Sequence, residues 1–314
     1  MCGLAGVILK NKNRSKNDLK TIADNFQQML LEADVRGGHA TGFAIIDNKG
    51  DYLIQKTNKD AFDFLETDDA NAALDLVSRN ATCIMGHTRY ATLGSPSFNK
   101  NNHPIRTGKT IGTHNGSIHN HKELFKKYNM KRFAQVDSEA IFRLYETSDS
   151  LKEFTENRLP NVRGRVSIVW ADLEYPDYIY MVKGNNPLEL AYIKDLDIYV
   201  YGSTTNIIKA GGWSKIQRLN VNPYTMLRVN TDTFRIRTKK IEIQKPIPIS
   251  KSNYVFDNKI GAYKKIPHIN SIIKKSKYEN TVSNFIPRFS YKDQQELFKK
   301  YKCNDGSTIK KVGK

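Results

Sequence analysis

Two spacings of apolar residues run through the chain, and they predict different elements. Residues 2–9 are apolar at almost every position, which predicts a strand buried on both faces. In residues 17–33 the apolar side chains recur every three or four positions with polar residues between them, a spacing typical of an amphipathic helix. The Arg-Gly-Gly-His sequence at residues 36–39 follows and predicts a tight loop.

Further along, the pattern changes from strands to helices and back to strands. Strands are expected at residues 41–46, 52–56, 82–85, 110–113, 166–171, 178–182, 188–193, 197–201, 225–229 and 233–237, and helices at 70–78, 122–127 and 138–146. The first two of these strands are expected to form a hairpin across residues 47–50. This order of elements predicts an α+β domain built on largely antiparallel sheets.

The regular pattern ends near residue 244. The sequence Lys-Pro-Ile-Pro-Ile at residues 245–249 interrupts it, because proline cannot donate to a sheet. Residues 245–314 hold about 16 Lys or Arg but only 5 Asp or Glu, and they are weakly periodic apart from a possible helix at about 291–301. We therefore expect one domain at residues 2–244 and a basic C-terminal extension at 245–314 that is partly ordered or wraps the domain.

Composition narrows the class of protein. The 314 residues are 39% hydrophobic, which is typical of a globular protein. No apolar run approaches the roughly 18 residues that a membrane helix needs, and residues 1–9 lack the features of a signal peptide, so we expect a cytoplasmic protein without membrane contact. The spacing of Cys2, Cys83 and Cys303 argues against a disulfide framework and against a zinc site.

The formal net charge of +18 has two interpretations. One is attraction to nucleic acid or another polyanion, with the basic extension as the contact. The other is a lysine-rich surface that is simply solvated, which the excess of Lys over Arg favours.

Candidate chemistry begins at the second residue. If Met1 is removed, Cys2 carries a thiol and a free α-amine, and the amine can take the proton of the thiol. A cysteine at this position alone is weak evidence for catalysis. Cys83, in an expected strand, is interpreted as a buried apolar residue, and Cys303 as incidental.

Three later segments combine with Cys2. They are Gly-His-Thr-Arg-Tyr-Ala-Thr-Leu-Gly at residues 86–94 with Asn-His-Pro at 102–104, Thr-His-Asn-Gly-Ser-Ile at 113–118, and Val-Asp-Ser-Glu at 136–139. Each has an ordinary interpretation by itself: Arg89 as a surface cation, Asn115 with Gly116 as a turn, and Asp137 as a helix cap. Their occurrence in this order after Cys2 argues for one shared site.

With these segments the chain resembles class II glutamine amidotransferase domains, the glutaminase half of glucosamine-6-phosphate synthase, phosphoribosylpyrophosphate amidotransferase and asparagine synthetase. The matching stretches are residues 2–7, 36–42, 86–94, 114–118 and 137–139, with looser matches at 164–170 and 187–188. The resemblance covers about residues 2–240. It implies the four-layer αββα sandwich of the N-terminal-nucleophile hydrolases, followed here by the basic extension.

The resemblance also assigns the reaction. Cys2 is the implied nucleophile, and the side chain of Asn115 and the backbone N–H of Gly116 form the implied oxyanion hole. The thiolate attacks the side-chain amide of glutamine, the α-amine returns its proton to the leaving ammonia, and water hydrolyses the γ-glutamyl thioester. This reaction needs no metal and no cofactor.

Other matched positions are expected to bind glutamine. Arg89 matches the position that takes the α-carboxylate, which suits a guanidinium, and Asp137 matches the position that takes the ammonium. Tyr90 and Thr92 match positions that line the pocket, and Arg36 is expected to shape the loop beside the nucleophile. His87, His103 and His114 are interpreted as structural hydrogen-bonding residues.

Three functions remain open. The first is a glutaminase that supplies ammonia to a separate synthase or modification enzyme, because residues 245–314 carry no phosphate-binding loop and no recognisable acceptor motif. The second is an autonomous amidohydrolase acting on a γ-glutamyl compound. The third is an inactive binding or structural protein of the same fold with a polyanion-binding extension, which the unusual residues Leu93 and Asn186 favour.

Overall fold

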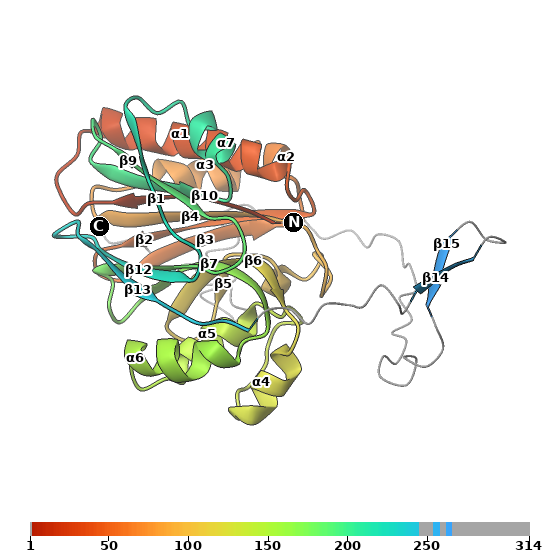
Figure 1. The fold of residues 1–314 in the computed structure, drawn as a ribbon. Helices are drawn as coiled ribbons and strands as arrows, with labels where there is room; N and C mark the ends of the chain where they lie inside the picture. The colour runs from red at the N-terminus through yellow and green to blue at the C-terminus, as the bar shows by residue number, and fades with distance from the viewer. Residues whose placement is uncertain (1, 245–253, 258–261, 266–314) are drawn as a thin grey trace, which may run out of the picture. The chain divides into compact units, whose positions relative to one another are not determined.

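Two antiparallel β-sheets stack face to face between two layers of helices (Figure 1). This computed structural model describes residues 2–244, 254–257 and 262–265. The chain divides into two compact units. Residues 2–244 belong to the first, and the described part of the second is a hairpin of β14 (Tyr254–Asp257) and β15 (Ala262–Lys265).

The first sheet has seven strands in the order β11-β9-β10-β1-β4-β2-β3. Their bounds are β1 (Gly3–Leu9), β2 (Ala40–Asp47), β3 (Tyr52–Thr57), β4 (Ala81–Arg89), β9 (Glu189–Ile193), β10 (Ile198–Gly202) and β11 (Ile216–Leu219). Strand β1 lies between β10 and β4, so the first residues of the domain are held at the middle of this sheet.

The second sheet has six strands in the order β13-β12-β8-β7-β6-β5. Their bounds are β5 (Ile105–Arg106), β6 (Thr110–Ile118), β7 (Gly164–Asp172), β8 (Tyr178–Lys183), β12 (Thr225–Asn230) and β13 (Ile236–Lys240). All pairings between the named strands are antiparallel, which confirms the predicted sheet type.

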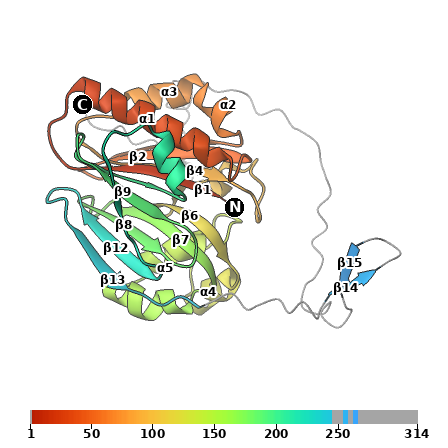
Figure 2. The ribbon, with the colours of Figure 1, turned by 45° about the horizontal axis from the view of Figure 1, so that its top comes forward.

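Each sheet is covered on its outer face by helices (Figure 2). The first sheet is covered by α1 (Lys16–Asp34), α2 (Ala61–Leu65), α3 (Asp68–Asp75) and α7 (Thr205–Ala210). The second is covered by α4 (His121–Lys127), α5 (Glu139–Glu146) and α6 (Leu151–Glu153), the last continuing through a π-helical turn (Phe154–Arg158) and a 3-10 turn (Leu159–Asn161). A further 3-10 turn spans Asn99–Asn101.

Three hydrophobic cores separate the four layers, and this explains the apolar run at residues 3–9. Val7 of β1 packs against the helices, whereas Leu4 and Ile8 pack against the second sheet. Successive side chains of a strand point to opposite faces, so a strand with both faces buried needs apolar residues throughout. The predicted α+β αββα arrangement is confirmed.

Several boundaries differ from those predicted. Strands β4 and β6 continue to Arg89 and Ile118, beyond the predicted ends at 85 and 113, because polar residues in them are buried rather than exposed in loops. Strand β13 begins three residues later than predicted. The short elements α2, α6, α7, β5 and β11 were not predicted. The predicted helix at about 291–301 and Cys303 lie outside the described residues.

No helix within the described ranges has the length and apolar character required to cross a membrane.

Candidate active site

Cys2 directly precedes the central strand β1 and is half-buried. Its Sγ lies 3.8 Å from the carbonyl oxygen of Tyr90, and Arg36 donates through Nε to the Cys2 carbonyl at 3.1 Å. Burial raises the pKa of the Cys2 thiol above its usual value, while its hydrogen bond with the Tyr90 backbone and the charge of Arg89 act in the opposite direction. The thiol is therefore protonated at neutral pH and needs a base in order to react.

Arg89, at the end of β4, is buried rather than a surface cation, with 3% of its surface exposed. Nη1 donates to Oδ1 of Asn102 at 2.9 Å, and Nη2 donates to the carbonyl oxygens of Leu93 and Gly94 at 2.7 and 2.8 Å. Among the described residues these bonds occupy three of its five N–H groups, which leaves Nε and one hydrogen of Nη1 for another acceptor. The unusual Leu93 contributes only its backbone to this contact.

Asn115 and Gly116 lie inside β6 and do not form the turn that an ordinary interpretation predicted. Gly116 has a φ of +157°, and a Cβ built on it would lie 1.9 Å from the carbonyl oxygen of Arg165. Any side chain at this position would therefore displace β7. The side-chain amide of Asn115 is buried and donates through Nδ2 to Oγ of Ser203 at 3.3 Å.

Ser203 follows β10 and joins the strand of Cys2 to Asn115. Its Oγ accepts the backbone N–H of Leu4 at 2.8 Å as well as the Asn115 amide, and its own N–H donates to the carbonyl of Leu4 at 2.9 Å. On the other side, Asn186 donates through Nδ2 to the carbonyl of Asn115 at 2.8 Å. The carbonyl of Asn186 in turn accepts from Oγ of Ser167 at 2.7 Å.

All four members of this chain of hydrogen bonds are buried, and sequence reasoning missed Ser203 and the role of Asn186. The only local signal for Ser203 is a hydroxyl that directly follows the buried run of β10. That signal is indistinguishable from the start of a helix, which Thr204 does cap.

Asp137 lies just before α5, but its side chain does not cap that helix. The N-cap of α5 is Ser138, and Oδ2 of Asp137 accepts the backbone N–H of Ile118 at the end of β6. The carboxylate is therefore fixed beside the strand that carries Asn115. Its charge and that of Arg89 both act on the Cys2 thiol, so Cys2, Arg89 and Asp137 lie in one electrostatic environment.

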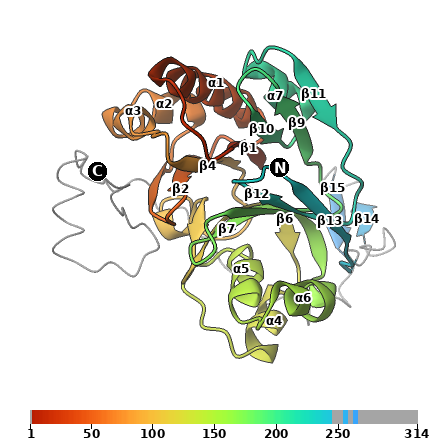
Figure 3. The same cartoon turned by 90° about the vertical axis from the view of Figure 1, so that its left-hand side faces the viewer.

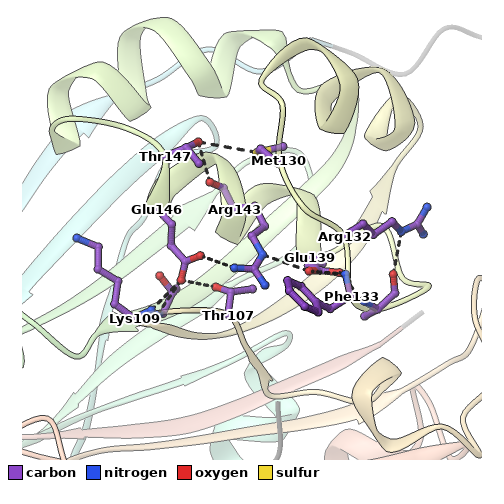
Figure 4. A network of polar contacts seen from close by, with 11 residues as sticks. Thr107, Lys109, Met130, Arg132, Phe133, Glu139, Arg143, Glu146 and Thr147 are labelled. Atoms are coloured by element: carbon purple, nitrogen blue, oxygen red, sulfur yellow. Dashed lines mark hydrogen bonds and ion pairs between the residues drawn. The ribbon is translucent and has the colours of Figure 1, made fainter. Parts of the chain in front are cut away.

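Helix α5 holds the loop that carries Asp137 through a network of charged groups (Figure 4). Glu139 accepts the backbone N–H groups of Phe133, at 3.1 Å, and Ala134, at 2.7 Å, and pairs with Arg143 at 3.2 Å. Arg143 also pairs with Glu146 at 3.0 Å. Glu146 in turn accepts from Oγ1 of Thr107 at 2.7 Å and from the backbone N–H of Lys109 at 2.9 Å. The loop, the helix and the start of β6 are thus tied together.

The two residues expected to line a glutamine pocket lie at an exposed edge. Tyr90 is 49% exposed, and its ring stacks on that of His39 with ring centroids 4.8 Å apart. Nδ1 of His39 accepts the backbone N–H of Ala91 at 3.0 Å. Thr92 is exposed. Their contact with a substrate remains a prediction, as do the roles of the other site residues.

Three histidines behind the site are buried and neutral. His87 stacks on His103, with ring centroids 4.1 Å apart, and its Nε2 bonds the carbonyl of His114 at 3.1 Å. Nδ1 of His114 bonds Oγ of Ser138 at 2.8 Å. Burial lowers the pKa of all three rings, that of His87 to about 3. Cys83 in β4 is buried, as predicted. No group of three or more potential metal-binding side chains is present among the described residues.

Comparison with known proteins gave relatives but no matching family model. The chain is 26% identical over 237 residues to the 7-cyano-7-deazaguanine synthase of Saccharolobus solfataricus, a match that covers 74% of this chain and 49% of the relative. It is 25% identical over 260 residues to the glutamine–fructose-6-phosphate aminotransferase of Staphylococcus epidermidis, covering 78% of this chain and 38% of the relative. The chain thus spans about half or less of the length of the curated relatives that it matches.

Solved structures share the fold at lower sequence identity. The glutamine phosphoribosylpyrophosphate amidotransferase of B. subtilis matches with a TM-score of 0.57 and 21% identity, over 76% of this chain and 49% of that one. A structure described as the allosteric regulatory enzyme of purine biosynthesis matches with a TM-score of 0.58 and 20% identity, over the same shares of the two chains.

Proposed function

Because these relatives and folds support a class II, N-terminal-nucleophile glutamine amidotransferase-like domain, we propose that the chain hydrolyses the side-chain amide of glutamine through a thioester on Cys2. The products are glutamate and ammonia. One arrangement carries the proposal. Strand β4, which ends at Arg89, pairs with β1 next to Cys2, and Ser203 ties Asn115 to Leu4 of β1. Asp137 is bonded to the strand that carries Asn115.

Binding uses the two charged residues. The free N–H groups of Arg89 take the α-carboxylate of glutamine, and Asp137 takes the α-ammonium. Both side chains are already fixed, Arg89 by the carbonyls of Leu93 and Gly94 and Asp137 by the N–H of Ile118. The cost of ordering them upon binding is therefore small.

Removal of Met1 starts the chemistry, because the α-amine of Cys2 then becomes the base that the buried thiol requires. The thiolate attacks the amide carbon, and the second N–H of Nδ2 of Asn115, together with the N–H of Gly116, stabilises the oxyanion. The C–N bond breaks, the amine gives its proton to the leaving ammonia, and a γ-glutamyl thioester remains. Water then cleaves the thioester, releasing glutamate and restoring the thiol.

The ammonia passes to an acceptor enzyme that acts in trans. Two observations support this part of the proposal. The printed names of the relatives are synthases and aminotransferases, and the chain matches half or less of their length. A cyano-deazaguanine and an amino sugar each contain a nitrogen that ammonia could supply, so a nucleobase or a sugar phosphate is the acceptor class we favour.

Intact mass and glutamate release, measured on one sample, test the proposal. We expect a mass that lacks Met1, measurable glutamate release, and loss of release by at least 10³-fold in Cys2→Ala. Cys83→Ala, which removes a buried thiol from β4, is the matched control and should keep its activity. Retention of Met1, or equal release by the wild type and Cys2→Ala, would contradict the hydrolysis. Full activity unaffected by any acceptor enzyme would favour an autonomous amidohydrolase.

A further inference from the structure

A basic trough crosses the outer part of the second sheet, and its lining includes none of the residues of the Cys2 site. It consists of two adjoining hollows of about 310 and 190 Å³ that share Arg228 and Arg237. The larger hollow is lined by Leu151, Lys152 and Thr155 of the α6 segment and by residues of β12 and β13. Figure 3 shows the α6 segment next to β13. We define the basic trough by Lys152, Tyr178, Arg228, Arg235, Arg237 and Lys239.

The strand register places the cations of the trough on one face. Met226 packs into the core between the second sheet and its helices, so Arg228, two residues further along β12, points to the same side. Arg228 lies directly opposite Arg237 of β13, and Met226 lies opposite Lys239. On β8, the neighbours across from Arg228 and Asn230 are Tyr180 and Tyr178.

This arrangement is unfavourable for the isolated protein. Like charges directly opposite one another in a sheet repel, and they destabilise it. Arg228, Arg235 and Arg237 form no ion pair with an acidic residue in the described part of the chain, while Lys239 pairs with Glu156 at 2.7 Å. The guanidinium of Arg228 instead lies 4.8 Å from the ring centroid of Tyr178. Three guanidinium groups on one face thus lack an acidic partner among the described residues, and those of Arg235 and Arg237 are exposed to an anion from outside.

We propose that the basic trough binds single-stranded nucleic acid. The two hollows form an open, elongated site rather than one closed chamber, which suits a chain of phosphates better than a single phosphorylated metabolite. Arg235 directly precedes β13, and Arg237 and Lys239 lie within it. At every second residue of an extended chain their side chains recur at intervals of about 7 Å, so they can contact successive phosphates. The half-buried side chains of Leu151 and Tyr178 offer surfaces for bases, as in single-strand binding proteins.

Fluorescence anisotropy with a labelled 20-nucleotide oligouridine tests this inference on the full chain. The triple variant Arg228→Gln, Arg235→Gln, Arg237→Gln is compared with Lys16→Gln, Lys126→Gln, Lys209→Gln. The control removes the same charge from exposed positions on three helices and leaves the basic extension intact. We expect the arginine variant to bind at least tenfold more weakly at 0.1 M salt. We also expect the slope of log affinity against log salt concentration to fall by about 2 in magnitude, because each phosphate contact on a single strand contributes about 0.7. The control should change affinity by less than threefold.

Three results would overturn the inference. The first is an equal loss of affinity in both variants, which would indicate that bulk charge alone is responsible. The second is equally tight binding of a 20-base-pair duplex. The third is displacement of the oligouridine by polyglutamate at the same charge concentration. Thermal melting of both variants verifies that they fold. Because glutamine hydrolysis is not measured, this outcome is independent of the proposed function.

Discussion

Ser203 connects the strand that carries Cys2 to the amide proposed to stabilise the oxyanion. In Ser203→Ala, the backbone N–H of Leu4 and Nδ2 of Asn115 both lose their buried acceptor. An unsatisfied buried donor costs about 1–3 kcal/mol, and two donors are affected, so we expect the free energy of unfolding to fall by at least about that amount. We also expect kcat for glutamate release to fall at least tenfold, with a smaller change in KM, because Asn115 acts on the transition state.

Denaturant unfolding and steady-state kinetics measure these two effects. Ser214→Ala is the matched control, since Ser214 is exposed and its hydroxyl donates to Asp195 at the surface. A Ser203→Ala variant that is destabilised but keeps the wild-type kcat would show that the serine is structural only.

At this same scale the sequence indicated some residues of the proposed site and not others. Cys2, Arg89, Asn115 and Asp137 lie in short local motifs, and the structure places them around the end of β1. Ser203 and Asn186 act through hydrogen bonds to residues 71 to 199 positions away, so no local pattern indicates them. The unusual residue Asn186 is explained by its hydrogen bond to the carbonyl of Asn115.

Among the helices, α5 has the most direct bearing on the site, because Glu139 fixes the loop that carries Asp137. In Glu139→Gln the pair with Arg143 is lost and the contacts with the N–H groups of Phe133 and Ala134 weaken. We expect a loss of about 1–3 kcal/mol of stability and a rise of KM for glutamine larger than the fall of kcat.

Glutamine titration of the glutamate-release rate separates KM from kcat in this variant. Glu123→Gln is the control, because Glu123 is 69% exposed and its contact with Arg163 is long, at 3.8 Å. An unchanged KM in Glu139→Gln would show that the loop keeps its position without this carboxylate.

Most elements were predictable because their packing is regular. The helix α1 and the strands β1, β2, β7 and β8 follow simple periodicities set by the cores on either side. The ends of β4 and β6 were not predictable, since His87 and Asn115 are polar residues in buried strand positions. Whether these two side chains are buried depends on hydrogen-bond partners from distant parts of the chain, which a short stretch of sequence does not contain.

For the molecule as a whole, the buried histidines predict sensitivity to acid. Burial lowers the pKa of His87 and His103 below the unfolded value of about 6.5, so the unfolded chain binds more protons at low pH. Their contribution to stability is therefore complete above about pH 6.5 and is lost as the pH falls below it. At pH 5 each ring accounts for a loss of up to about 2 kcal/mol in the free energy of unfolding.

Urea unfolding between pH 7.5 and 5 measures this loss. His103→Phe keeps an aromatic ring against His87 but cannot titrate, so we expect a weaker dependence on pH. His119→Gln changes an exposed histidine and should leave the dependence as in the wild type. The same slope in all three proteins would assign the acid sensitivity to other groups.

The bond between Leu4 and Ser203 spans 199 positions of the chain, which has a consequence for how the site comes into being. At about 5–20 residues per second, a ribosome needs roughly 10–40 s to synthesise the chain between them. Before that interval ends, the ribosome has already made Cys2, Arg89, Asn115 and Asp137. It has not yet made Ser203, which joins β1 to β6. The proposed site around Cys2 can thus be completed only after most of the domain has been translated.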